Sequence, residues 1–482
     1  MRVLSIASEV YPLIKTGGLA DVAGALPAAL AREGVEMRTL LPGYPAVTAR
    51  LEAAETVHEY AYLFGGPARI VAGRVGALEL FVLVADHLYA RAGNPYLAPN
   101  GLDWPDNAQR FAALARAGAD IAKGAATSFA PEIAHAHDWQ AGLTGAYLVY
   151  DGGPRPGTVL TIHNIAFQGH YSAALLAELG LPPSAMTIDG VEYFGGIGFL
   201  KAGLLLSDRI TTVSPTYARE ILTPQFGMAL DGLLRTRADV VSGIVNGIDD
   251  EVWNPATDPT IAATFSAMRL DHRDANRAAL QARLGLDLDA QAPIFGVVSR
   301  FTSQKGLDLL LAVLPEIVEE GGQIALLGSG ERALEEGFAA AVREHPGRVG
   351  AMFGYDESLA HLIQAGVDFL LVPSRFEPCG LTQLCALRYG AAPIVARVGG
   401  LADTVIDANE AALSAGVATG LQFYPPEISE LREAIRRAFA ISREPGLLRR
   451  LRLNGMRADV SWRGPAKRYA ALYRGLAAGP RG

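Results

Sequence analysis

The sequence predicts an α/β protein with two domains, each built on a parallel sheet. The chain has 482 residues, which is more than a single hydrophobic core usually organises. Half of the residues are hydrophobic and 19% are charged, so apolar material is sufficient for buried parallel sheets. Short aliphatic and β-branched runs alternate with longer stretches of helical periodicity, as they do in chains of βα units.

In the first half, the first predicted strand runs from Val3 to Ser8 and is followed by a glycine loop, Lys15 to Gly18. A helix is expected after this loop, because apolar residues recur at helical spacing at Leu19, Val22, Leu26 and Leu30. Further predicted strands end in polar residues, at His137, His163 and Val213. Parallel strands open onto ligand crevices at their carboxyl ends, so functional side chains are expected at these ends.

In the second half, the strand and helix alternation restarts after a cluster of turn-forming residues, Gly243 to Pro255. We therefore expect one domain over residues 1–245 and a second over 246–455. The predicted strands of the second domain form a doubly wound sheet of about six strands. They are Pro293 to Ser299, Gln323 to Leu327, Val349 to Phe353, Asp368 to Pro373 and Pro393 to Ala396. Residues 456–482 are expected to form a terminal helix that packs back on the first domain.

Charge and cysteine usage exclude several classes of protein. Lys plus Arg total 42 against 50 for Asp plus Glu, a net charge of −8, which argues against a nucleic-acid partner. No long uncharged apolar run is present, so neither a membrane span nor a membrane partner is expected. Cys379 and Cys385 fit neither a disulfide framework nor a zinc site, and no export signal is visible, so the cytoplasm is the expected compartment.

Three loops combine glycines with charged side chains. Lys15 to Gly18 follows the first strand, and Ser299 to Gly306 carries both Arg300 and Lys305. The loop Ser374 to Thr382 leads into a helix, whose first N–H groups attract an anion. These features predict binding of a diphosphate, with Glu377 facing a neutral, hydroxylated group. For Lys15 alone, an ordinary turn with a solvated lysine remains an equal alternative.

The sequence also contains short patterns that resemble a metal site, a dinucleotide-binding loop and a glycosidase carboxylate pair. Asp287 and Asp289 lie in a polar turn, and His135 and His137 share a strand face without a third ligand nearby, so no metal site is expected. Gly328 to Ala333 resembles a dinucleotide fingerprint but does not follow the first strand of its domain. A glycosidase pair among the carboxylates Glu9, Asp138 and Glu377 stays open.

Five motifs carry a family resemblance: KTGGLADV from Lys15, HDWQAG from His137, TIHNIAFQG from Thr161, VNGID from Val245 and PSRFEPCGLTQLCALRYG from Pro373. Kept in order over nearly the whole chain, they resemble bacterial glycogen synthases and plant starch synthases. The resemblance implies a GT-B fold, two Rossmann-like doubly wound domains facing across a deep cleft that closes on substrate. It also implies retaining, metal-independent and cofactor-free transfer of glucose from ADP-glucose to the non-reducing end of an α-1,4-glucan such as glycogen.

The resemblance also implies roles for individual residues. Lys15, Arg300 and Lys305 would neutralise the diphosphate with the backbone N–H groups of 380–382, Glu377 would orient the glucose hydroxyls, and Tyr355 would stack on adenine. Asp138 and His163 would lie beside the anomeric carbon, with the His163 carbonyl stabilising its developing charge. The implied catalytic residues are Glu377, Asp138, His163, Lys305 and Arg300. The implied substrate-binding residues are Lys15, Gly18, Asp21, Tyr96, Asn246, Tyr355, Cys379, Gly380, Leu381 and Thr382.

The chain departs from the family pattern in the two charged loops of the second domain. Cys385 stands eight positions after Glu377, where many GT-B enzymes carry a second glutamate. Phe301 and Ser303 stand where these synthases usually have Leu and Trp. Two other functions remain open, a UDP-glucose-dependent transferase and a non-catalytic glucan-binding protein that stacks sugars on aromatic residues such as Tyr96. Homo-oligomerisation is also possible.

Overall fold

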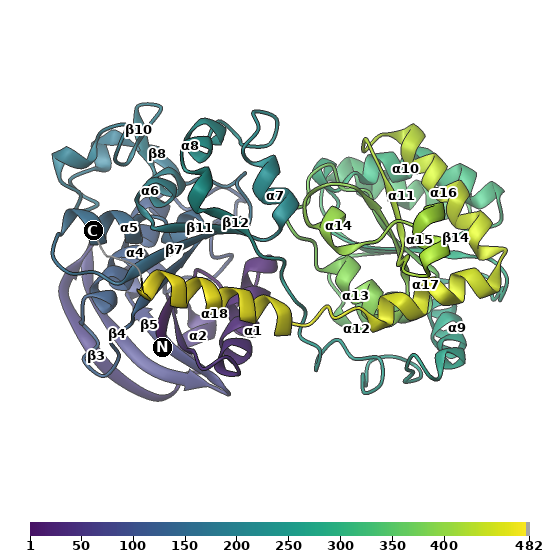
Figure 1. Ribbon diagram of the computed structural model, residues 1–482, viewed down its shortest axis with the longest axis horizontal. Coiled ribbons are helices and arrows are strands. Elements are labelled where there is room, and N and C mark those ends of the chain that lie inside the picture. Colours follow the sequence, from purple (N-terminus) through teal and green to yellow (C-terminus); the bar gives the residue numbers. More distant parts are fainter. Residues whose placement is uncertain (479–482) are drawn as a thin grey trace. The chain divides into compact units, whose positions relative to one another are not determined.

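The computed structural model describes residues 1–478 and divides into two compact units (Figure 1). Unit 1 comprises Met1–Asn246 together with residues 462–478, and unit 2 comprises Gly247–Ser461. The helix α17 (Pro445–Arg457) belongs to unit 2, and the chain returns to unit 1 in α18 (Arg463–Ala478). The last four residues of the expected terminal helix, 479–482, lie outside the described residues.

Unit 1 is built on a nine-stranded sheet in its described residues, with the order β12-β11-β7-β6-β1-β2-β5-β4-β3. The strands are β1 (Arg2–Ile6), β2 (Glu36–Pro42), β3 (Glu52–Leu63), β4 (Gly66–Val75), β5 (Leu78–Val84), β6 (Ile133–His137), β7 (Gly157–Ile162), β11 (Arg209–Thr212) and β12 (Val241–Gly243). Pairing is parallel from β12 to β5 and antiparallel from β5 to β3. Because β1 lies between β2 and β6, the order reverses beside β1, which is the topological switch point of a doubly wound sheet.

Helices and a small second sheet complete unit 1. The helices are α1 (Gly18–Ala31), α2 (Pro45–Thr48), α3 (Asp86–Tyr89), α4 (Asn107–Ala122), α5 (Leu143–Tyr150), α6 (Phe199–Leu206), α7 (Pro215–Glu220) and α8 (Asp231–Thr236). The strands β8 (His170–Ser172), β10 (Gly196–Gly198) and β9 (Glu192–Tyr193) pair antiparallel. The helix α18 packs beside α1, where Tyr469 and Tyr473 join Leu26 and Leu30 in one buried cluster (Figure 1).

Unit 2 has a six-stranded sheet that is parallel throughout, in the order β15-β14-β13-β16-β17-β18. The strands are β13 (Ile294–Val298), β14 (Gln323–Gly328), β15 (Val349–Phe353), β16 (Phe369–Val372), β17 (Ala392–Ala396) and β18 (Leu421–Phe423). The remaining helices are α9 (Arg273–Leu284), α10 (Leu307–Glu319), α11 (Arg332–Glu344), α12 (Glu357–Gly366), α13 (Thr382–Tyr389), α14 (Gly399–Thr404), α15 (Glu410–Ala415) and α16 (Ile428–Ser442). The predicted doubly wound sheet is confirmed, with its switch point between β13 and β16.

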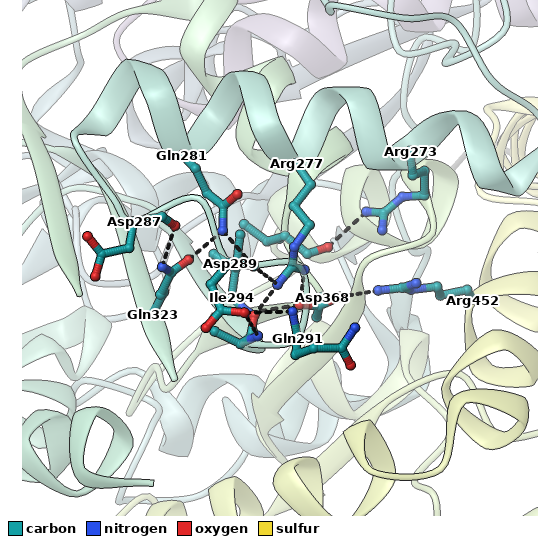
Figure 2. Close-up of polar contacts among 12 residues, drawn as sticks. Arg273, Arg277, Gln281, Asp287, Asp289, Gln291, Ile294, Gln323, Asp368 and Arg452 are labelled. Carbon is teal, nitrogen blue, oxygen red and sulfur yellow. Dashed lines mark hydrogen bonds and ion pairs between the residues drawn. The ribbon is translucent and has the colours of Figure 1, made fainter. Parts of the chain in front are cut away.

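A buried ionic network ties the amino ends of these strands to α9 and α17 (Figure 2). Asp368, directly before β16, accepts from Arg277 at 2.7 Å, from the backbone N–H of Ile294 at 2.8 Å, and from Arg452. Burial opposes ionisation of Asp368, but the two arginines hold its pKa below the usual value. Arg273 is buried and donates to three backbone carbonyls. The network holds the amino ends of β13 and β16 in place, and the charged loops follow the carboxyl ends of the same strands.

No helix within residues 1–478 is both long enough and apolar enough to span a membrane.

Candidate active site

In unit 2, the charged loops follow β13 and β16, the two neighbouring strands between which the strand order reverses. The first loop contains a short 3-10 turn, Ser303–Lys305, and leads into α10. The second passes through Glu377 and leads into α13. Both loops leave the carboxyl ends of parallel strands, so the fold brings the predicted cation and carboxylate to one edge.

Lys305 and Glu377 form an ion pair between these loops. The Lys305 Nζ lies 2.5 Å from Glu377 Oε2, and the two side chains are 19% and 9% exposed. Ser374 Oγ donates to the same carboxylate oxygen at 3.1 Å. Low exposure limits screening by solvent, and the contacts from Lys305 and Ser374 hold the Glu377 carboxylate in one orientation.

Two consecutive glycines, Gly399 and Gly400, support the turn at Glu377. A Cβ on Gly399 would lie 2.0 Å from the Glu377 carbonyl oxygen, and the φ of Gly399 is +44°. The Gly400 N–H donates to the carbonyl oxygens of Glu377 and Pro378 at 3.1 and 3.0 Å. A side chain at either glycine would collide with the backbone of this turn, so Gly399 and Gly400 fix the position of the Glu377 backbone. The sequence analysis missed both, and the Gly-Gly dipeptide was the only available signal.

The start of α13 offers backbone N–H groups next to this ion pair. Gly380 has a φ of +72°, which favours glycine, and its carbonyl accepts from Gln383 Nε2 at 2.8 Å. A pocket of about 60 Å³ is lined by Ser299, Lys305, Glu377, Gly380, Leu381 and Thr382, among others. Cys379 is buried. Five of the predicted residues, including the first residue of α13, therefore line one small polar recess, which suits an anion.

Arg300 and Tyr355 are more exposed than this recess. The Arg300 side chain is exposed on its loop, and Tyr355 is 77% exposed just after β15, with its hydroxyl donating to Glu357. The residue after Arg300, Phe301, is fully buried and packs on Phe338 with ring centroids 5.3 Å apart. The departure at Phe301 therefore anchors the loop.

The glycine turn after β14 braces the same loop. Phe301 N–H donates to the Ser329 carbonyl at 2.8 Å, and a Cβ on Gly330 would lie 2.2 Å from the Phe301 carbonyl oxygen. The Ser303 N–H donates to Glu331 Oε1 at 2.9 Å. The near-match to a dinucleotide fingerprint thus has a local structural use beside the Arg300 loop.

In unit 1, the buried carboxylate Glu9 holds the loop after β1. Thr16 Oγ1 donates to it at 2.7 Å, and the Thr16 N–H and the Tyr96 hydroxyl donate to it as well. Lys15 Nζ lies 2.8 Å from Asp21 Oδ1, and both side chains are about one-third exposed. Glu9 therefore anchors Thr16 and Tyr96, while Lys15 extends beyond them. The sequence analysis considered Glu9 only as part of a carboxylate pair.

Asp138, directly after β6, has a backbone conformation that is rare for a residue with a side chain. Its φ is +55°, and its Oδ1 accepts from the His163 N–H at 2.6 Å. Burial raises the pKa of the Asp138 carboxyl to about 7, against the opposing effect of the His163 and Asn164 N–H groups. Strain and a perturbed pKa at a strand end are typical of functional sites. Asn246, also buried, is the last residue of the first segment of unit 1.

Three histidines gather at β6 and β7. The rings of His135 and His137 lie with centroids 4.2 Å apart and planes at 35°, so the predicted shared strand face is confirmed. His135 bonds to Tyr473 and Thr161, and His137 Nδ1 lies 3.0 Å from His163 Nε2. Within residues 1–478, no three His, Cys, Asp or Glu side chains form a group able to hold a metal ion.

Two doubly wound units with charged or strained loops at their switch points define the class of a GT-B glycosyltransferase. Residues 2–236 match the family described as the starch synthase catalytic domain, and residues 282–455 match the glycosyl transferases group 1. The fold is similar to the catalytic domain of starch synthase IV from Arabidopsis thaliana bound to ADP and acarbose. That match has a TM-score of 0.89, 31% identity and 99% coverage of both chains. A sucrose-phosphate synthase from Thermosynechococcus elongatus shares the fold at 19% identity and a TM-score of 0.60, with 98% of both chains covered.

Sequence comparison narrows the class to a family. The chain is 62% identical to a glycogen synthase of Rhodopseudomonas palustris strain BisB18 over 475 residues, covering 98% of this chain and 97% of the relative. It is also 62% identical to a glycogen synthase of Methylocella silvestris over 476 residues, covering 99% of both. The chain belongs to the glycogen synthase family.

Proposed function

We propose that the protein transfers glucose from ADP-glucose to the non-reducing end of an α-1,4-glucan, with retention of the α configuration and without a bound metal ion. The observation that carries this proposal is the largely buried Lys305–Glu377 pair next to the start of α13. Support for the substrates comes from relatives named glycogen synthase and from a starch synthase solved with ADP and acarbose.

The diphosphate of the donor is assigned to the cations of the loops. Breaking the bond between glucose and phosphate leaves negative charge on the diphosphate, so fixed positive charge accelerates the step. Lys305 and Arg300 supply it in unit 2, together with the N–H groups at Gly380, Leu381 and Thr382. Lys15 in unit 1 contributes a further cation, held by Asp21.

The donor sugar and base are assigned to residues beside the recess. Glu377, oriented by Lys305 and Ser374, accepts hydrogen bonds from glucose hydroxyls. The buried Cys379 contributes its backbone to the same turn. Tyr355, an exposed ring at the carboxyl end of β15, stacks on adenine.

In unit 1, Asp138 and the His163 carbonyl are assigned to the anomeric carbon, where positive charge develops. Asp138 is fixed by the His163 N–H. Gly18, with no side chain at the start of α1, gives the sugar and diphosphate close access to the backbone. Tyr96 and Asn246 complete the substrate contacts.

The compartment and the absence of a metal are part of the same proposal. The chain has two cysteines, Cys379 and Cys385, and both are buried; so few cysteines support a reducing compartment, the cytoplasm. The two loop cations and the helix start would do the electrostatic work that other transferases give to a divalent ion.

The test is an assay of nucleotide release from purified protein with glycogen and either ADP-glucose or UDP-glucose, with and without a chelator. We expect ADP release and α-amylase-sensitive chain growth that the chelator leaves unchanged. No nucleotide release from either donor by folded protein would refute the enzymatic function. Preference for UDP-glucose would refute the assigned donor, and loss of activity with chelator would refute the assignment without metal.

A further inference from the structure

His137 lies against the proposed sugar residue His163 but has no role in the assignments above. Its side chain is fully buried at the end of β6, and its Nδ1 lies 3.0 Å from Nε2 of His163 on the loop after β7. Within residues 1–478, its other ring nitrogen, Nε2, has no hydrogen-bond partner. His163 is only partly buried, so of the two rings it is the one that a ligand reaches.

Both rings are neutral in this setting. Burial lowers the pKa of His137 to about 3, and burial together with the neighbouring His137 lowers the pKa of His163 well below its usual value. The ring of His135, whose centroid lies 4.2 Å from that of His137, is itself hydrogen-bonded to Tyr473 and Thr161. Each neutral imidazole carries one N–H group, and one of the two N–H groups donates the hydrogen bond between the rings.

The bond has two possible directions with different costs. If His163 Nε2–H donates, His137 must carry its own proton on Nε2, where it is a buried N–H without an acceptor. If His137 Nδ1–H donates, its Nε2 is left only with a bare lone pair. Buried N–H groups without partners are among the rarest polar groups in folded proteins. The second direction is therefore favoured.

We infer that His137 is a positioning residue that donates from Nδ1 to Nε2 of His163 and so fixes the His163 proton on Nδ1. The His163 Nδ1–H group then donates a hydrogen bond to a hydroxyl oxygen of the bound sugar. This inference rests on the proposed function for its ligand, but the position of the proton is a property of the free protein. The backbone of His163 remains fixed independently, through its N–H bond to Asp138.

The direct test is NMR of the wild-type protein labelled with ¹⁵N in histidine, using long-range proton–nitrogen correlations that distinguish the two neutral tautomers. The variant His163→Gln assigns the His163 signal by removing it. We expect the proton on Nδ1 of His163. A proton on Nε2 would overturn the inference.

Kinetics of three variants provide the second test. His137→Leu removes the donor, and we expect kcat to fall about tenfold, with a smaller change in the glucan KM. His137→Asn places an amide N–H near the lost Nδ1–H and should recover most of kcat. His135→Leu is the matched control on the same strand, because His135 has no hydrogen bond to His163 among the described contacts. It should lower thermal stability but leave kcat within about twofold.

The outcomes separate the two proposals. Equal kcat for His137→Leu and His135→Leu, or no recovery in His137→Asn, would overturn the positioning role. Failure of the wild-type protein to transfer glucose would refute the proposed function, whereas the tautomer of His163 would still be decided by the NMR experiment.

Discussion

The substitution Lys305→Ala tests the electrostatic core of the proposed mechanism. The ammonium lies 2.5 Å from Glu377 and is 19% exposed, so water would replace its charge poorly. Removing one fixed donor to a developing negative charge costs about a hundredfold in kcat, or about 2.7 kcal/mol. We expect this loss in steady-state ADP release, with unchanged retention on a glycogen affinity gel.

The substitution also leaves Glu377, 9% exposed, without its cation, and breaking a buried pair destabilises a protein by about 3 kcal/mol. Loss of fold and loss of chemistry are separated by the double variant Lys305→Ala with Glu377→Gln. The neutral amide needs no cation, so the double variant should recover the melting temperature lost by the single one. It should not recover kcat.

A matched control is Lys123→Ala, the same change at an ion pair with Asp151, where the ammonium lies 3.7 Å from the carboxylate. We expect kcat within about twofold of wild type, because Lys123 lies in the turn after α4 and belongs to none of the loops assigned to substrate. Equal loss of activity and glycogen retention in Lys305→Ala would contradict the assigned role. So would recovery of kcat in the double variant, because the defect would then be structural.

Three further predictions concern ionisable groups. Asp368→Asn leaves its arginine partners unneutralised and should destabilise unit 2 by about 3 kcal/mol in urea unfolding. The pKa of Asp368 is lower in the folded protein than in the unfolded chain, so its ionised form stabilises the fold above the unfolded-state pKa. This contribution is lost as pH falls through the folded-state pKa, and only the wild-type protein should show that loss. Burial lowers the pKa of His361, but Glu357 and Asp258 raise it above its usual value overall. Its stabilisation should be complete below about pH 6.5 and fall as pH rises through the folded pKa, a loss absent in His361→Phe. Asp138, with its pKa raised to about 7, should destabilise the fold increasingly as pH rises from its unfolded value. Asp138→Asn should therefore raise the free energy of unfolding by roughly 2–4 kcal/mol near pH 8 while lowering kcat; lower stability than wild type at that pH would contradict the raised pKa.

The fold class and the two loops of unit 2 were predictable because their signals are local. A run such as Pro293 to Ser299 shows a strand, and the glycine and cations that follow it show a loop at the strand's carboxyl end. The parallel sheet then brings Lys305 and Glu377 together without further information, because β13 and β16 are neighbours. The assigned contacts to ADP-glucose and glucan stay predictions.

The supports of the site were not predictable because they depend on pairing across the sheet. Gly399 and Gly400 lie more than twenty residues after Glu377 and reach its turn only because β17 pairs beside β16. His137 meets His163 because the register of β6 on β7 sets His137 opposite Thr161. A sequence shows that His135 and His137 share a face, but it does not show which strand lies next to them.

The two units differ in how burial acts on their ionisable groups, and the difference matches the chemistry assigned to them. In unit 2, Lys305, Arg300 and the start of α13 place positive charge at the loops, with Glu377 paired to Lys305, so the recess suits a charged diphosphate. In unit 1, burial keeps His163 neutral and raises the pKa of Asp138 to about 7. A neutral ring with a fixed proton suits sugar hydroxyls, which are themselves uncharged and are distinguished by the direction of their hydrogen bonds. In unit 1, a His163 N–H group with a fixed direction therefore distinguishes sugar hydroxyls better than a further charged group would.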